Sequence, residues 1–180
     1  MVRRRCRTIV VSDAGADPKC TLEDLGNAVR KIAIDLGVKV EFDRIQLRRR
    51  SDTALAGVYC AYGKILYPEG NEGRIVYFKP GFYGTEEPAD VRAYAAANAK
   101  FPHESTINQW FGESQFESYR SLGAFVIGEI FRKARNGKHD MTPRDFADRV
   151  HSYLGEFQRN QVNGGPTVVD FRRRIAAAAR

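Results

Sequence analysis

The sequence predicts an α/β fold in which a central sheet is flanked by helices, with a β-hairpin and a C-terminal helical region. A short apolar, β-branched run at residues 8–11 is typical of a buried parallel strand. Two longer strand-like runs, residues 56–67 and 74–79, are separated by turn-forming residues and indicate the hairpin. Apolar residues recur at three- and four-residue steps, as in amphipathic helices, over residues 22–36, 107–135 and 142–157.

The first predicted strand, Thr8 to Val11, leads into a polar turn at residues 12–18. Its continuous apolar character predicts a strand that is covered on both faces and paired on both edges. We expect only later strands, from Val38 onward, to be available to it within this chain, so that an isolated chain exposes a sheet edge. The polar turn follows the C-terminal end of the strand, which is where open α/β sheets place ligands.

The next elements are a helix from Leu22 and a strand from Val38. Thr21 is the predicted N-cap of the helix, and Gly37 is its predicted stop. Residues 38–42 alternate apolar and charged side chains, as in a half-buried strand. Together these segments predict a helix that packs on the sheet through one apolar stripe.

The C-terminal half is predicted to be helical. Residues 106–109 match a capping box, which predicts a long helix from Ile107 to Arg135. A further helix should start at Thr142, with Pro143 at its first position. We therefore divide the chain into residues 1–135, an α/β unit, and residues 136–180, a helical extension with a basic tail.

The chain carries a net charge of +7, from 29 Lys and Arg against 22 Asp and Glu. Much of the excess lies in three arginine-rich runs, at residues 3–7, 48–50 and 172–174. These runs are either solvated strand ends and a tail or a surface for a polyanion. Nucleic acid is disfavoured as a partner, because no basic motif is interleaved with aromatic residues.

The sequence also limits location and cofactors. No apolar run approaches the ~20 residues that a membrane-spanning helix needs, and no signal peptide is visible. Cys6, Cys20 and Cys60 are odd in number and far apart, as expected for reduced thiols in a cytosolic compartment. We predict a cytoplasmic chain without cofactor or metal and leave membrane association of a longer parent protein open.

Three residues are candidates for a binding site: Asp13, Asp17 and His103. The two carboxylates flank residues 14–16 and can hold a divalent cation or act as a general base, or Asp13 can form an Asx-type turn with Gly15 at positive φ. His103, next to Glu104, can serve acid–base chemistry or only loop structure. The chain has no GxSxG elbow, HExxH, P-loop or GxGxxG motif, so we predict no catalytic residue.

Several long stretches, in the right order, strongly resemble one family. They are RRRCRTIVVSDAGADP, TLEDLGNAVRKIAIDLGV, DVRAYAAAN and FPHESTINQWFGESQFESYRSLG, covering roughly residues 2–123. They resemble the C-terminal part of the catalytic domain of bacterial patatin-like phospholipases. The family consists of α/β lipid acyl hydrolases that use a serine in a GxSxG elbow, an aspartate in a DGG or DGA motif, and a glycine-rich oxyanion loop.

The resemblance implies that those catalytic parts lie upstream of the matching segment. Asp13-Ala14-Gly15 does not fit the aspartate motif, since alanine replaces the first glycine and the position falls after the expected site. The first hypothesis is therefore a portion of a patatin-like lipid hydrolase that is inactive alone. Its partner would be the upstream part of the same domain or a chain supplying it, with lipid contacted only through the complete enzyme. The alternative is a basic α/β module that binds a polyanion or a protein.

Overall fold

The computed structural model describes residues 1–51, 57–132 and 141–162. In this part of the chain, a four-stranded mixed sheet has the order β1-β4-β3-β2. Its strands are β1 (Thr8–Ser12), β2 (Lys39–Phe42), β3 (Cys60–Leu66) and β4 (Glu72–Phe78). A short 3₁₀ helix (Val2–Arg4) precedes the sheet, and the α-helices are α1 (Glu23–Leu36), α2 (Ala89–Ala97), α3 (Glu113–Phe131) and α4 (Pro143–Val162).

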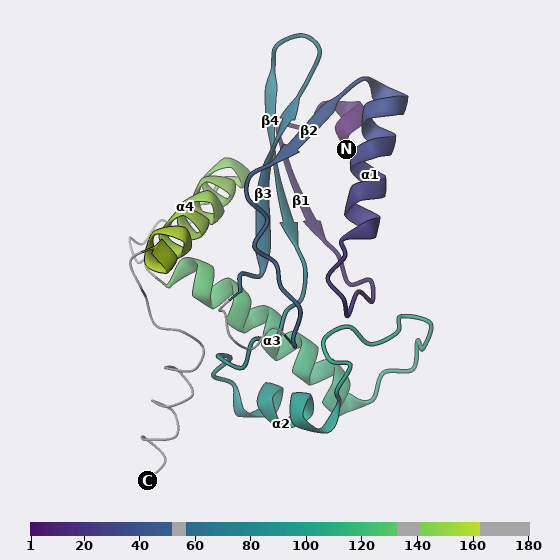
Figure 1. Cartoon of the computed structure of the whole chain (residues 1–180), viewed down its shortest axis with the longest axis vertical. Helices are drawn as coiled ribbons and strands as arrows, with labels where there is room; N and C mark the ends of the chain where they lie inside the picture. The colour runs from purple at the N-terminus through teal and green to yellow at the C-terminus, as the bar shows by residue number, and fades with distance from the viewer. Residues whose placement is uncertain (52–56, 133–140, 163–180) are drawn as a thin grey trace.

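The sheet combines a hairpin with one long-range parallel pair. Strands β3 and β4 are antiparallel neighbours, with Cys60 opposite Phe78, and β2 pairs antiparallel with the outer side of β3. Strand β1 runs parallel to β4, with Thr8 opposite Arg74 and Ser12 opposite Phe78. The C-terminal ends of β1 and β4 therefore lie side by side (Figure 1).

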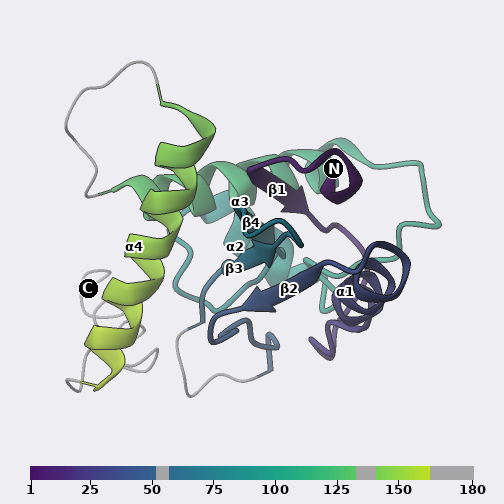
Figure 2. The same ribbon diagram turned by 90° about the horizontal axis from the view of Figure 1, so that it is seen from above.

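Helices cover both faces of the sheet (Figure 2). On one face, Ile9, Val40, Ile65 and Ile75 form an apolar cluster against which α1 packs through Val29, Ile32 and Leu36. On the other face, Val58, Tyr62 and Val76 pack with buried residues of α3 and α4. This second cluster continues through Phe101 to α2, which lies beside α3 at the end of the sheet (Figure 1).

The predicted fold class is confirmed in its main elements. The hairpin forms as expected, and β2 buries Val40 while Lys39 and Glu41 face solvent. Gly37 ends α1 in the left-handed conformation, with φ of 61°. Helix α4 starts at Pro143, where Thr142 and Asp145 exchange side-chain-to-backbone hydrogen bonds at 3.2 Å and 3.1 Å.

One predicted helix cap and one predicted helix start are wrong. Thr21 does not cap α1, because its hydroxyl donates to the Asp17 carboxylate instead. Helix α3 begins at Glu113 rather than at Ile107. In the segment before it, the side chains of Ser105 and Asn108 accept from the backbone N–H groups of Ile107 and Trp110, at 3.3 Å and 3.1 Å. Such local turns compete with helix formation.

The first strand has the exposed edge that the sequence predicts for this chain alone. Strand β1 forms the edge of the described sheet, with β4 as its neighbour. Ile9 is buried, but the side chain of Val10, on the opposite face, is 51% exposed. The expected open sheet edge is therefore present in the described part of the chain.

Candidate functional site

Five polar residues gather where β1 and β4 end, and we call them the strand-end cluster: Asp13, Asp17, Tyr77, Lys79 and His103. The backbone N–H of Asp13 donates to the carbonyl of Phe78 at 2.9 Å, which extends the parallel pairing by one residue and sets Asp13 beside Lys79. The three candidates predicted from sequence thus lie in one cluster, which also contains two residues that were not predicted.

Asp13 is held by three donors. Its carboxylate accepts from the Lys79 ammonium at 2.9 Å, from the backbone N–H of Gly15 at 2.8 Å, and from the Tyr77 hydroxyl. Burial by itself raises the pKa of Asp13, but the bonds from Tyr77, Lys79 and Gly15 hold that pKa below its usual value. Asp13 is thus held ionised by protein donors rather than by water, since only 16% of its side chain is exposed.

The Asx turn that the sequence predicts as one alternative for Asp13 is present, but Gly15 does not have the conformation predicted for it. The bond from Gly15 N–H to Asp13 Oδ1 closes such a turn. Positive φ among the described glycines occurs at Gly37, Gly70 and Gly84, so the expected positive φ at Gly15 is wrong. Glycine is needed there for space, because a Cβ would lie 2.9 Å from Asp13 Oδ1.

Asp17 closes the turn that leads into α1. Its carboxylate accepts from the backbone N–H groups of Thr21 and Leu22, at 3.0 Å and 2.9 Å, and from the Thr21 hydroxyl at 3.2 Å. Burial raises the pKa of Asp17, but these backbone bonds outweigh it and lower the pKa. The carboxylate therefore acts as a capping group for the chain before α1.

His103 lies in the turn after α2 and is buried against the strand-end cluster. Its Nδ1 accepts from the backbone N–H of Asp17 at 3.4 Å, so the imidazole is neutral at this nitrogen. Burial lowers the pKa of His103, and the nearby Lys79 ammonium lowers it further, against opposing effects of Asp17 and Asp13. His103 thus joins the turn after α2 to the turn after β1.

Lys79 is the central cation of the strand-end cluster, and the sequence did not reveal it. Its side chain is 3% exposed, and its ammonium also donates to the carbonyl of Gly15 at 2.8 Å. In the sequence, Lys79 is marked only by its position directly after an apolar strand. Its role depends on the pairing of β4 with β1, which brings Lys79 next to Asp13.

The strand-end cluster satisfies its own polar groups. The cation interpretation of Asp13 and Asp17 does not fit the geometry, because the Lys79 ammonium occupies the position beside Asp13. In residues 1–51, 57–132 and 141–162, no group of three or more His, Cys, Asp or Glu side chains is arranged to hold a metal ion. A general base needs a lone pair that faces a substrate. Here the acceptors of Asp13, Asp17 and His103 receive internal donors, so the arrangement fits a structural clamp.

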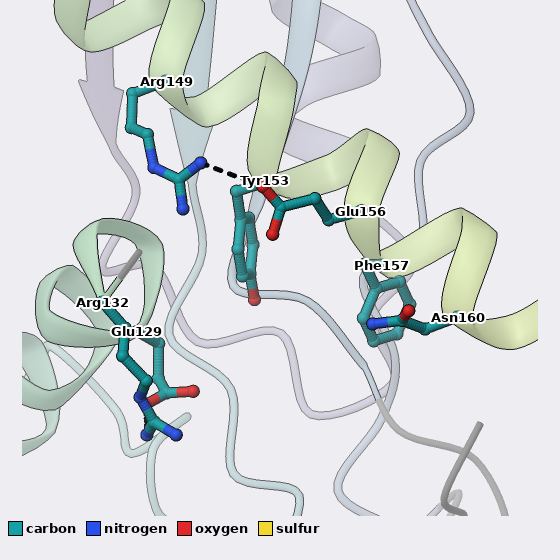
Figure 3. A pocket seen from close by; sticks show the side chains of 7 residues that line it. All are labelled: Glu129, Arg132, Arg149, Tyr153, Glu156, Phe157 and Asn160. Carbon is teal, nitrogen blue, oxygen red and sulfur yellow. Dashed lines mark hydrogen bonds and ion pairs between the residues drawn. The ribbon is translucent and has the colours of Figure 1, made fainter. Parts of the chain in front are cut away.

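A small cavity lies between α3 and α4 (Figure 3). Its volume is about 180 Å³, below the ~300 Å³ at which ligand pockets begin. Arg149 on its wall donates to the carbonyl of Ile130 at 2.7 Å and to Glu156 at 3.2 Å. The charges of Arg149 and Glu156 are therefore engaged within the chain.

The two arginine runs that the structure describes lie apart from each other. Arg5 pairs with Glu69 at the hairpin turn, while Arg50 lies at the opposite end of the sheet, near α2. The Arg50 guanidinium donates to the carbonyls of Asn98 and Phe101, at 2.9 Å and 2.8 Å, and stacks over Phe82. Residues 172–174 lie outside the described residues. Arg50 is therefore part of the protein's own structure rather than a free anion-binding group.

No family model, no curated protein and no solved structure matches this chain. Among the helices that the structure describes, none has the length and apolar character needed to cross a bilayer. The assignment of function consequently depends on the sequence resemblance and on the geometry described above.

Proposed function

We propose that the chain is the C-terminal part of the catalytic domain of a patatin-like lipid acyl hydrolase. In this role it is a scaffold that is inactive alone and completes its sheet with a strand from the upstream part of the same domain or from a chain supplying it. The observation that carries the proposal is the outer edge of β1, which no described strand pairs with, next to a strand-end cluster whose carboxylates are bonded internally.

The edge is built to accept a further strand. In a parallel ladder, hydrogen bonding alternates sides from one residue to the next. The carbonyl of Arg7 and the N–H of Asp13 bond to β4, so the odd-numbered residues of β1 face β4. The backbone groups of Thr8, Val10 and Ser12 therefore point away from it. Exposed edges of this kind favour pairing with another strand.

The exposed side chain of Val10 supports the same proposal. It lies at the edge of the face that α3 and α4 cover, beside the buried Val76 of β4. An added strand with its own apolar side chains would cover Val10 and continue that core. Covering an apolar side chain of this size is worth about 1.5–3 kcal/mol when it is fully buried.

The internal bonding of the strand-end cluster supports the proposal that the chain is inactive alone. Acyl transfer needs an activated nucleophile and preorganised donors for the oxyanion. In the strand-end cluster the donors of Lys79 and Tyr77 are directed at Asp13. The cluster instead fixes the C-terminal ends of β1 and β4, the edge at which an upstream active site would be assembled.

Hydrolysis assays test the proposal. The chain alone should not cleave p-nitrophenyl esters or phospholipids above background. A longer product of the same gene, extended upstream, should cleave them and lose this activity when the serine of its GxSxG motif is replaced by alanine. Turnover by the chain alone that disappears in Asp13→Ala, or an inactive extended product without such a motif, would overturn the proposal.

A further inference from the structure

The segment between α2 and α3 projects from the body of the molecule in both views (Figures 1 and 2). From Ser105 to Gly112 it contains no charged residue. The side chains of Ile107 and Trp110 are 91% and 90% exposed, and Phe111 is also exposed. We call residues 105–112 the apolar loop, because its large side chains face solvent instead of the core.

The apolar loop is attached to a fixed base. Phe101, just before it, is fully buried, and Glu104 accepts from the hydroxyl of Tyr94 at 3.1 Å and from the amide of Gln115 at 3.1 Å. Within the loop, Ser105 and Asn108 bond to the backbone N–H groups of the residues two positions on. The loop thus satisfies part of its backbone through its own polar side chains while its apolar ones point outward.

We propose that the apolar loop inserts into the interfacial region of a lipid surface with zwitterionic headgroups. Such insertion is driven by apolar burial, and tryptophan prefers the boundary between headgroups and acyl chains. The nearest charged residues along the chain, Glu104 and Glu113, are acidic and do not favour anionic lipids. The inference goes beyond the proposed hydrolase, because lipid binding needs no catalytic residue.

The size and shape of the apolar loop favour lipid over a protein partner. A buried aromatic side chain covers about 150–250 Å², so Trp110 and Phe111 together offer at most about 500 Å², to which the smaller Ile107 adds. A standard protein interface buries about 800 Å² on each partner. A projecting loop buries most of its apolar surface in a fluid medium that surrounds it, as the headgroups and acyl chains of a lipid layer do.

Trp110 makes the test direct, since it is the single tryptophan of the chain. With vesicles of phosphatidylcholine, its emission should shift to the blue, lose its accessibility to an aqueous quencher and gain quenching by brominated acyl chains. Raised salt should leave the binding unchanged, because the contact is apolar. Tryptophan emission that is unchanged by vesicles would overturn the inference.

Matched variants distinguish insertion of the apolar loop from non-specific adsorption through other exposed apolar side chains. Ile107→Ser and Phe111→Ser should each weaken co-sedimentation with vesicles roughly tenfold, which corresponds to about 1.4 kcal/mol. Ile34→Ser is the control, since Ile34 is 74% exposed on α1, and it should bind as the unaltered chain does. Equal weakening by Ile34→Ser, or a blue shift that depends on protein concentration and not on vesicles, would contradict lipid insertion and indicate protein association.

The vesicle result and the hydrolysis result are independent. Lipid binding by a chain whose extended product is inactive would leave the apolar loop inference standing and remove the hydrolase. An active extended product whose Trp110 emission is unchanged by vesicles would support the hydrolase and overturn the apolar loop inference.

Discussion

The strand-end cluster and the apolar loop reverse the usual placement of residue types. In the former, the Lys79 ammonium and the His103 imidazole are buried; Lys79 donates to the Asp13 carboxylate, and His103 accepts from the backbone N–H of Asp17. In the latter, isoleucine and tryptophan are almost fully exposed. His103 and Ile107 are only four residues apart in the chain, so the two regions are continuous.

The comparison separates what the molecule uses internally from what it offers to the outside. Polar groups at the ends of parallel strands ordinarily suggest a ligand site, yet here each carboxylate is saturated by the protein. The exposed side chains of the apolar loop and the edge of β1 have no such partners in the described part of the chain. We therefore propose that these two features contact lipid and a completing strand, and that the strand-end cluster stabilises the fold.

The largest expected effect is the loss of the central cation. Lys79→Met leaves the Asp13 carboxylate without its ammonium partner, and breaking a buried pair from one side costs about 3 kcal/mol or more. Urea denaturation followed by circular dichroism should show this as a lower midpoint. In the double variant D13N/K79M, part of the stability should return, because the unpaired charge is gone.

Lys64→Met is the matched control for Lys79→Met. Lys64 lies on β3 with 52% of its side chain exposed, and its contact with Glu72 spans 3.9 Å. Its removal should change the free energy of unfolding by no more than about 0.5 kcal/mol. Equal effects of the two lysine variants would show that the strand-end cluster does not clamp the fold.

The next effect is a loss of stability on acidification. The folded pKa of His103 lies below its ordinary value of 6.5, so the unfolded chain takes up the proton first as the pH falls. The stabilisation by neutral His103 is complete above pH 6.5 and declines below it, toward the folded pKa. Asp13 and Asp17 have lowered pKa values, so their contributions are present above 3.8 and decline at lower pH.

His103→Asn removes the loss of stability that His103 causes below pH 6.5. Urea midpoints measured from neutral pH to about pH 5 should fall less steeply in this variant than in the unaltered chain. His151→Asn is the control, since His151 is exposed and 3.6 Å from Asp43, and it should keep the original slope. A slope that follows His151 and not His103 would contradict the account of the strand-end cluster.

The smallest effect belongs to the apolar loop. Trp110→Ser and Ile107→Ser should leave the stability of the isolated chain within about 0.5 kcal/mol, because they remove side chains that touch little of the protein. Thermal melts in the absence of lipid are sufficient to show this. A clear loss of stability would mean that the loop is part of the core.

Local sequence patterns predicted much of the fold. The alternation of Val40 with its charged neighbours gave β2, Gly37 marked the end of α1, and Pro143 marked the start of α4. Each of these signals acts over a few residues, where periodicity and backbone preference are decisive. Asp13 was singled out because a polar residue follows a buried-type strand.

Long-range pairing could not be predicted in the same way. The partnership of Asp13 with Lys79 depends on β1 lying parallel to β4, and nothing in either strand's composition encodes this register. The start of α3 was misplaced because two local turns, at Ser105 and Asn108, competed with the capping box.

The central claim is that the outer edge of β1 receives another strand, and amide hydrogen exchange at Val10 and Val11 tests it most directly. The Val11 amide faces β4 and should be protected in the chain alone, whereas the Val10 amide faces outward and should exchange rapidly. In the upstream-extended product, the Val10 amide should become as protected as that of Val11. A Val10 amide that is already protected in the chain alone, or that still exchanges rapidly in the extended product, would contradict the account.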